Sequence, residues 1–184
     1  MAHPWHDLDT FADRAAGVFF AVMEIPRGGK VKYELDKRTG LLRVDRVLYS
    51  SVIYPANYGF IPRTYCDDGD PLDVLVLSSE GMQPLAVVEA RAIGLMRMED
   101  GGKEDDKIVA VHVNDPAFAD YREIAELPAH IGRELRRFFL DYKLLENKSV
   151  KVEELLGRGD AEKVIDDAVA LYAARTEALR EIVR

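Results

Sequence analysis

The chain has 184 residues, of which 48% are hydrophobic and 32% charged, and its formal net charge is −8. This length suits one domain with a sizeable core, so we expect residues 1–184 to form a single domain. The acidic balance argues against a nucleic-acid partner. No apolar run approaches the roughly 20 residues of a membrane span, and the lone cysteine, Cys66, excludes an internal disulfide. These last two features predict a cytoplasmic protein.

The first 17 residues have no sustained hydrophobic period, and we expect them to lie over the surface. His3 and His6 could bind a metal, but a packed or hydrated segment without metal is the favoured interpretation. Three β-rich runs follow, at residues 18–25, 30–35 and 41–48. Glycine-containing turns separate these runs, and the second alternates strictly between apolar and polar residues, which predicts an antiparallel meander.

Residues 49–65 are rich in Tyr, Pro, Asn and Gly and are expected to form an ordered connection. Further strands are predicted in three apolar runs, at residues 72–77, 84–98 and 108–113. Two acid-rich turns lie next to these strands, at residues 67–73 and 99–107. Acidic side chains are therefore expected to gather at strand ends.

The rest of the chain reads as helical. An amphipathic pattern starts at Pro128 and runs to about residue 146, and a second begins with Asp160 as N-cap and continues over residues 160–183. Strands first and helices last predict the α+β class, with a small closed or partly open antiparallel β-barrel, OB-like, flanked by two C-terminal helices.

The turn at residues 67–73 carries four carboxylates, which repel one another unless a positive group lies between them. Gly69 and Pro71 bend the chain between the acids, so that their oxygens can converge on one point. Oxygen ligands grouped in this way suit Mg²⁺, Mn²⁺ or Ca²⁺ better than zinc. The competing interpretation is a solvated acidic turn before a strand.

Other charged and hydroxyl-bearing residues extend this pattern along the chain. The further acids are Glu24, Glu34, Asp100 and Asp105; the bases are Lys32, Arg46, Lys107 and Lys143; and the hydroxyl donors are Tyr54, Tyr58 and Tyr142. Each alone is more often a surface pair or a core residue. Together they are what gripping and cleaving a polyanionic phosphate requires.

The segment from Asp68 to Val74 resembles the signature of the soluble family I inorganic pyrophosphatases, in which acids alternate with a small residue, a proline and an apolar residue. Other blocks resemble that family in the same order. They are Glu24-Ile25-Pro26, Lys32-Tyr33-Glu34, Val44-Asp45-Arg46, Tyr54 to Gly59, Asp100 to Lys107, Phe138-Phe139 and Tyr142-Lys143. The resemblance covers residues 18–150 and implies Mg²⁺-dependent hydrolysis of pyrophosphate by one catalytic domain.

The resemblance also implies roles for the matching residues. The metal ligands would be Asp68, Asp73 and Asp105 for the tightest Mg²⁺, with Asp73 shared with a second ion, Asp100 aiding a third, and Glu34 and Glu24 completing the rim. Asp70 would be the general base. The phosphoryl groups would be held by Lys32, Tyr142, Lys143, Arg46 and Tyr58, while Tyr54 and Lys107 orient their neighbours. Several Mg²⁺ ions, with Mn²⁺ as a possible substitute, and a homo-oligomer are also implied, with a hexamer favoured over a dimer.

Two positions depart from the family pattern. Gly101 stands where an acid often follows Asp100, so a peripheral carboxylate is missing. In the run of acids at residues 104–106 the register is ambiguous, and Asp105 is chosen because it lies two residues before Lys107.

Two other classes of protein compete with this interpretation. A Ca²⁺-binding EF-hand would need glycine at the sixth loop position and a helix on each side, whereas the sixth residue from Asp68 is Asp73 and a strand is expected to follow. An OB-like barrel could stack single-stranded nucleic acid on surface aromatic side chains, but the chain is acidic and has no basic stripe.

Overall fold

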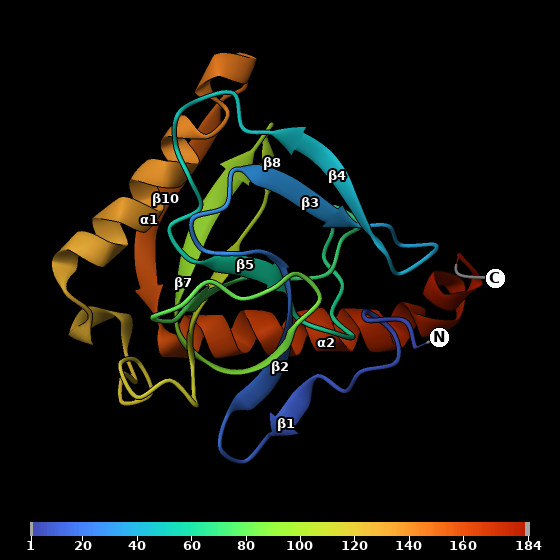
Figure 1. Ribbon diagram of the computed structural model, residues 1–184. Helices are drawn as coiled ribbons and strands as arrows, with labels where there is room; N and C mark the ends of the chain where they lie inside the picture. The colour runs from blue at the N-terminus through green and yellow to red at the C-terminus, as the bar shows by residue number, and fades with distance from the viewer. Residues whose placement is uncertain (1, 183–184) are drawn as a thin grey trace.

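The computed structural model describes residues 2–182, as a twisted sheet flanked by two long helices (Figure 1). The strands are Phe11–Asp13 (β1), Val18–Ile25 (β2), Val31–Leu35 (β3), Leu42–Val47 (β4), Asn57–Phe60 (β5), Asp73–Leu77 (β6), Val87–Asp100 (β7), Lys103–Glu104 (β8), Lys107–His112 (β9) and Val150–Gly157 (β10). The helices are Ala129–Asp141 (α1) and Arg158–Glu181 (α2), with short 3₁₀ helices at Ile124–Glu126 and Leu144–Glu146.

The sheet closes into a barrel. Along it β2 pairs with β5, β5 with β6, β6 with β9 and β9 with β7, and a further pairing of β7 with β2 completes the ring. All of these pairs are antiparallel except β6 with β9, which run parallel. The predicted α+β class with an OB-like barrel and two C-terminal helices is confirmed, whereas the parallel pair was not expected in a barrel predicted to be antiparallel.

The central strands are buried on both faces, which explains their continuous apolar character. On β6, Leu75 and Leu77 pack in the cluster that contains the α1 residues Phe138 and Phe139, whereas Val74 packs in the cluster covered by α2. The two helices thus cover opposite faces of the same strands.

Glycine allows β5 to approach β2 closely. A Cβ atom at Gly59 would lie 2.0 Å from the carbonyl oxygen of Val22, so no side chain fits there. This contact sets the spacing of two strands that carry site residues, Glu24 on β2 and Tyr58 on β5.

Strands β3 and β4 form a separate two-stranded sheet. The predicted meander is therefore correct for these two strands and wrong for β2, which pairs with β1, β5 and β7 instead. The segment at residues 49–65 is ordered as expected, but it also contributes strand β5, because Asn57 to Phe60 pair along β6.

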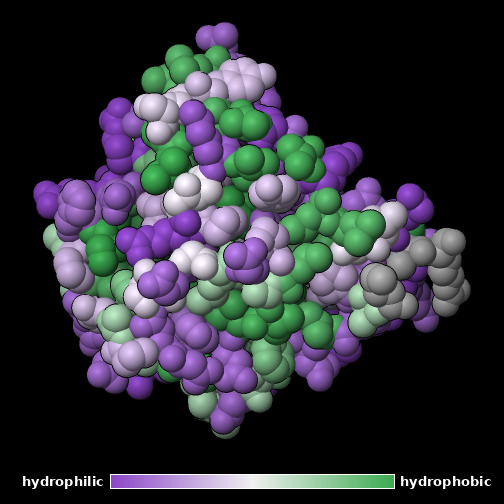
Figure 2. All heavy atoms as spheres, viewed as in Figure 1, coloured by the Kyte–Doolittle hydropathy of each residue, from purple (hydrophilic) through white to green (hydrophobic). Residues whose placement is uncertain are grey.

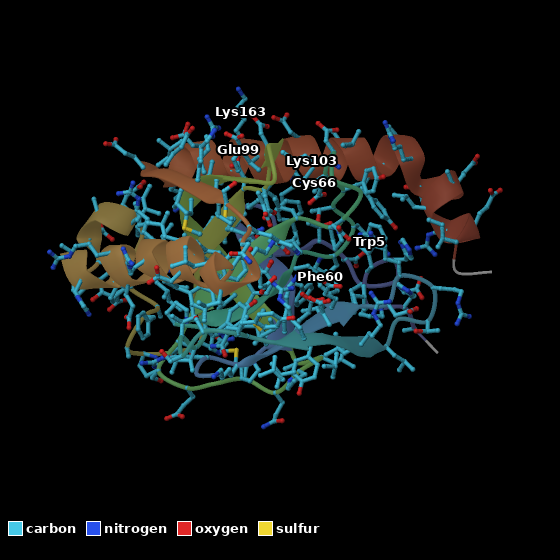
Figure 3. All side chains as sticks on the ribbon, turned by 90° about the horizontal axis from the view of Figure 1, so that it is seen from above. Trp5, Phe60, Cys66, Glu99, Lys103 and Lys163 are labelled. Atoms are coloured by element: carbon cyan, nitrogen blue, oxygen red, sulfur yellow. The ribbon has the colours of Figure 1, made fainter. Side chains whose placement is uncertain are left out.

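The expectation that the first 17 residues lie over the surface is wrong for their aromatic residues. Trp5 is fully buried and His6 is 1% exposed. Trp5 packs in a cluster with Phe60 and Tyr172, and it lies on the sheet-facing side of α2 (Figure 3). The indole donates a hydrogen bond to the carbonyl of Thr64 over 2.8 Å.

The C-terminal part differs from expectation in one strand. Strand β10 lies between the two predicted helices, where no strand was expected, and it pairs antiparallel with the long strand β7. Helix α1 ends at Asp141, before the predicted residue 146, and α2 begins at Arg158 with Gly157 as N-cap. The last residue of the predicted helix, 183, lies outside the described residues. Between residues 2 and 182 there is no helix long and apolar enough to cross a membrane.

Candidate active site

A cavity of about 540 Å³ opens at the ends of the barrel strands, beside the β3–β4 hairpin. It gathers nearly all of the predicted site residues. The predicted acids that line it are Glu24, Glu34, Asp68, Asp70, Asp73, Asp100 and Asp105. The predicted bases and tyrosines that line it are Lys32, Lys107, Lys143, Tyr54, Tyr58 and Tyr142. Segments far apart in the sequence thus converge on one acidic, partly basic hollow.

Asp73 lies at the centre of the hydrogen-bond network. Its Oδ2 accepts from the Tyr58 hydroxyl and from Lys107 Nζ, both over 2.5 Å. Lys107 also pairs with Asp105, so one ammonium bridges the two carboxylates. Burial lowers the pKa of Lys107, but the charges of Asp73 and Asp105 more than offset it, and the net pKa is raised. Lys107 is therefore a fixed cation, 2% exposed, at the base of the cavity.

Two acids of the cavity have raised pKa values because their negative charge is unfavourable where they lie. Burial, and then the charge of Asp73, raise the pKa of Glu24 to about 8, although its Oε1 accepts a hydrogen bond from the Leu35 amide over 2.7 Å. Burial, together with neighbouring carboxylates, also raises the pKa of Asp68. Carboxylates crowded in this way without enough countercharge favour the binding of a cation.

The donor set fits a hard divalent cation, because the lining acids offer oxygen and no sulfur. Among residues 2–182, no three His, Cys, Asp or Glu side chains are already arranged as a metal cluster. Lys107 contacts Asp73 Oδ2 and Asp105 Oδ1, which leaves Asp73 Oδ1 and Asp105 Oδ2 as the carboxylate oxygens that Lys107 does not engage. Ion binding thus requires these side chains to adjust around Lys107.

The acidic turn is closed by hydrogen bonds between its own residues. Asp68 Oδ1 accepts from the Asp70 amide over 3.0 Å, and the Asp70 carbonyl accepts from the Cys66 amide over 2.9 Å. Gly69 has a φ of +93°, which an L residue rarely adopts. The turn runs directly into β6, so it is not the helix-flanked loop of an EF-hand.

The substrate-binding bases are paired with acids in this structure. Lys32 donates to Glu34 Oε1 over 2.6 Å, and Lys143 pairs with Asp100. Tyr142 is 5% exposed next to Lys143, and burial raises its pKa, so the hydroxyl keeps its proton as a donor. Burial likewise raises the pKa of Tyr54.

Arg46 is the one predicted site residue that does not line the cavity. Its guanidinium pairs with Asp45 and donates through Nε to Glu146 Oε1 over 2.7 Å, and its Nη2 is buried without a hydrogen-bond partner. These contacts hold the guanidinium between Asp45 and Glu146, outside the cavity lining.

The structure places the two neighbouring acids Asp105 and Asp106 in different surroundings. Asp105 lines the cavity, whereas Asp106 accepts from the Met98 amide over 3.3 Å and lies 3.6 Å from Arg97. Gly101 lies at the tip of the β7–β8 hairpin with a φ of +59°, which favours glycine over an acidic residue there.

The sequence interpretation missed three bases that also line the cavity: Lys37, Arg43 and Lys103. Lys103 lies on the β7–β8 hairpin and also lines a second hollow together with Cys66; both residues are labelled in Figure 3. Arg43 lies 3.6 Å from Glu34 across the β3–β4 hairpin. The alternation of β3 and β4 could have placed Arg43 on the same face as Glu34, but no local signal identifies Lys37 or Lys103.

The tyrosines are too buried to offer their faces for base stacking. Tyr54 and Tyr58 are 1% and 7% exposed, whereas stacking of single-stranded nucleic acid needs open aromatic faces. The second alternative from the sequence therefore has no support in the site.

Comparison with known proteins agrees with the geometry. The sequence model of the inorganic pyrophosphatase family matches residues 21–173. The soluble inorganic pyrophosphatase of Oryza sativa subsp. indica is 59% identical over 173 residues, 94% of this chain and 80% of the rice protein. Soluble inorganic pyrophosphatase 2 of Chlamydomonas reinhardtii is 53% identical over 171 residues, 93% of this chain and 88% of that protein.

Solved structures give the same result. The crystal structure of the inorganic pyrophosphatase from Thermus thermophilus has a TM-score of 0.88 at 38% identity, over 94% of this chain and 99% of that one. The inorganic pyrophosphatase from Helicobacter pylori has a TM-score of 0.84 at 40% identity, over 90% and 98%. The chain therefore belongs to the soluble family I inorganic pyrophosphatases.

Proposed function

We propose that this protein hydrolyses inorganic pyrophosphate to two phosphates in a Mg²⁺-dependent reaction. Water attacks phosphorus in line, without a covalent intermediate. The observation that carries the proposal is one cavity that joins the acids of the 67–73 turn to Lys and Tyr donors from distant strands and α1. Pyrophosphate needs both groups, because its charge must be neutralised and its leaving phosphate stabilised.

The acids would hold the cations. Asp68, Asp73 and Asp105 line the cavity together with Lys107, and Asp100, Glu34 and Glu24 lie around the same cavity. Several Mg²⁺ ions, for which Mn²⁺ can substitute, would supply Lewis acidity and a water molecule of lowered pKa when bound. Glu24, with its raised pKa, would give up its proton when cations bind near it.

The remaining residues would act on water and substrate. Asp70, at the apex of the acidic turn, takes the proton of the attacking water as general base. Lys32, Lys143 and Tyr142 hold one phosphoryl group, and Arg46 with Tyr58 holds the other. Lys107 and Tyr54 fix the orientation of their neighbours. Arg46 would reach the substrate after releasing Asp45 or Glu146.

We also propose that residues 1–184 act as one catalytic domain in the cytoplasm, and that the chain assembles as a homo-oligomer, with a hexamer as the first candidate. The single cysteine supports a reducing compartment.

Apolar side chains gather on the upper part of the face shown in Figure 2. Exposed apolar residues on and around β4 and the second 3₁₀ helix are Val44, Val47, Tyr49, Leu144 and Leu145. Such a patch suits an interface between copies.

Release of phosphate from pyrophosphate by the purified protein tests the proposed activity. With Mg²⁺ present we expect rapid release, and with excess EDTA we expect none. A well-folded protein that releases no phosphate in the presence of Mg²⁺ would refute the proposal.

A further inference from the structure

The turn of the β3–β4 hairpin contacts the acidic turn at residues 67–73 through Lys37. Lys37 Nζ lies 2.5 Å from Asp70 Oδ1 and donates to the Gly69 carbonyl over 2.8 Å. Both Lys37 and Asp70 line the cavity. One ammonium therefore contacts both the backbone and the carboxylate at the apex of the turn.

The hairpin turn that carries Lys37 is itself rigid. Asp36 Oδ1 accepts from the amide and the hydroxyl of Thr39, both over 2.8 Å. The Asp36 carbonyl accepts from the Gly40 amide over 2.8 Å, and Gly40 has a φ of +70°. Because this turn is closed by several hydrogen bonds, the backbone of Lys37 has a defined position.

The buried N-terminal segment anchors the same turn. His3 Nε2 lies 3.1 Å from the Lys37 carbonyl, while His3 Nδ1 accepts from the Trp5 amide over 3.3 Å. Since Nδ1 accepts, Nε2 carries the proton and donates. A Cβ atom at Gly40 would lie 2.9 Å from Pro4 Cδ, so the turn packs directly on this segment. Figure 1 shows the hairpin turn and the N-terminus on the same side of the molecule.

We propose that Lys37 is a positioning residue that aims the Asp70 carboxylate at the attacking water; this inference rests on the proposed function. The Asp70 side chain is 52% exposed and follows a glycine of positive φ, so without a partner it would sample several orientations. A half-exposed ion pair contributes little to stability. Its effect is therefore on rate, because small misplacements of a reacting group can slow a reaction by up to about 100-fold.

Kinetics of single and double variants test this role. We expect Lys37→Met to lower kcat about tenfold with the KM for pyrophosphate changed by less than about twofold. In an Asp70→Asn background the same substitution should have no further effect, because there is no carboxylate left to aim. Lys37→Arg, which keeps the charge, should recover part of the loss. Arg38→Met is the matched control, since Arg38 is exposed in the same turn and lies outside the cavity lining.

A second readout needs no turnover. In the metal-free protein, Lys37→Met should speed amide exchange in residues 66–70, where the amides of Cys66, Gly69 and Asp70 are hydrogen-bonded within the turn, and Arg38→Met should not. A wild-type protein that cannot hydrolyse pyrophosphate would overturn the proposed function alone, and the exchange comparison would still decide whether Lys37 fixes the turn.

Three results would overturn the positioning role. The first is a Lys37→Met variant with full kcat. The second is an equal loss in the Asp70→Asn background, together with a raised KM, which would make Lys37 a direct phosphate ligand. The third is unchanged amide exchange in the turn.

Discussion

Asp70 combines an exposed carboxylate with few structural duties. Its carboxylate pairs with Lys37, and its backbone amide and carbonyl close the turn. We expect Asp70→Asn to lower kcat by about 100-fold or more, the usual effect of losing a general base. The melting temperature should barely change, because the backbone contacts survive. Turnover close to wild type would remove Asp70 from the role of base; phosphate release and thermal melting measure both effects.

His6 gives the protein a pH dependence that is unrelated to the active site. It is buried, with Nδ1 2.8 Å from the Tyr172 hydroxyl, and His3, Arg180 and Asp7 act on it electrostatically. Burial, followed by the charges of His3 and Arg180, lowers its pKa from 6.5 to about 4. Between pH 6.5 and about 4, His6 is therefore protonated in the unfolded chain and neutral in the folded chain.

The sign of this effect follows from linkage. As pH falls from 6.5 to about 4, the free energy of unfolding should decrease, by at most about 3 kcal/mol from this residue. Urea unfolding at several pH values, compared with His6→Gln, measures the difference. If the variant loses stability over this range as steeply as the wild type, His6 is not the source.

At the scale of elements, barrel closure depends on the close approach of β5 to β2. We expect Gly59→Ala to prevent folding or to destabilise the protein by more than about 3 kcal/mol, because the new Cβ would lie 2.0 Å from the Val22 carbonyl oxygen. Gly159→Ala is the matched control. Gly159 lies in the first turn of α2 with open space around it, so alanine there should be neutral or slightly stabilising. Chemical unfolding of both variants checks this, and equal stabilities would contradict it.

Most elements could be predicted from local patterns. The apolar run of β6, the alternation of β3 and the amphipathic pattern of α1 each report their own environment, and the acidic turn reports its chemistry through composition alone. Strand β10 had a local signal in the alternation of Val150 and Val152, but this alternation is interrupted by a register shift before Leu155.

The features that were missed depend on contacts between distant segments. Nothing near Trp5 indicates that Phe60 and Tyr172 will bury it. The parallel pairing of β6 with β9 is set by the whole ring, and the contact of Lys37 with Asp70 exists only once the hairpin lies over the acidic turn. Motif resemblance selected the predicted acids together with Lys32, Lys107 and Lys143, whereas the bases Lys37, Arg43 and Lys103 line the cavity only through tertiary packing.

At the scale of the molecule, a chain with a net charge of −8 must attract a polyanionic substrate. The buried Lys107 and the neighbouring bases make the cavity locally more positive, and bound cations would complete the reversal of charge. Asp73 is the residue through which these parts meet, since Tyr58 and Lys107 both contact its Oδ2.

The rate of phosphate release from pyrophosphate as Mg²⁺ is titrated, for the wild type and for Asp73→Asn in parallel, tests this account most directly. Circular dichroism should first establish that both proteins are folded. We predict saturable activation by Mg²⁺ in the wild type and a loss of at least about 100-fold in the variant. Hydrolysis by the wild type that is independent of Mg²⁺, or full activity in folded Asp73→Asn, would contradict it.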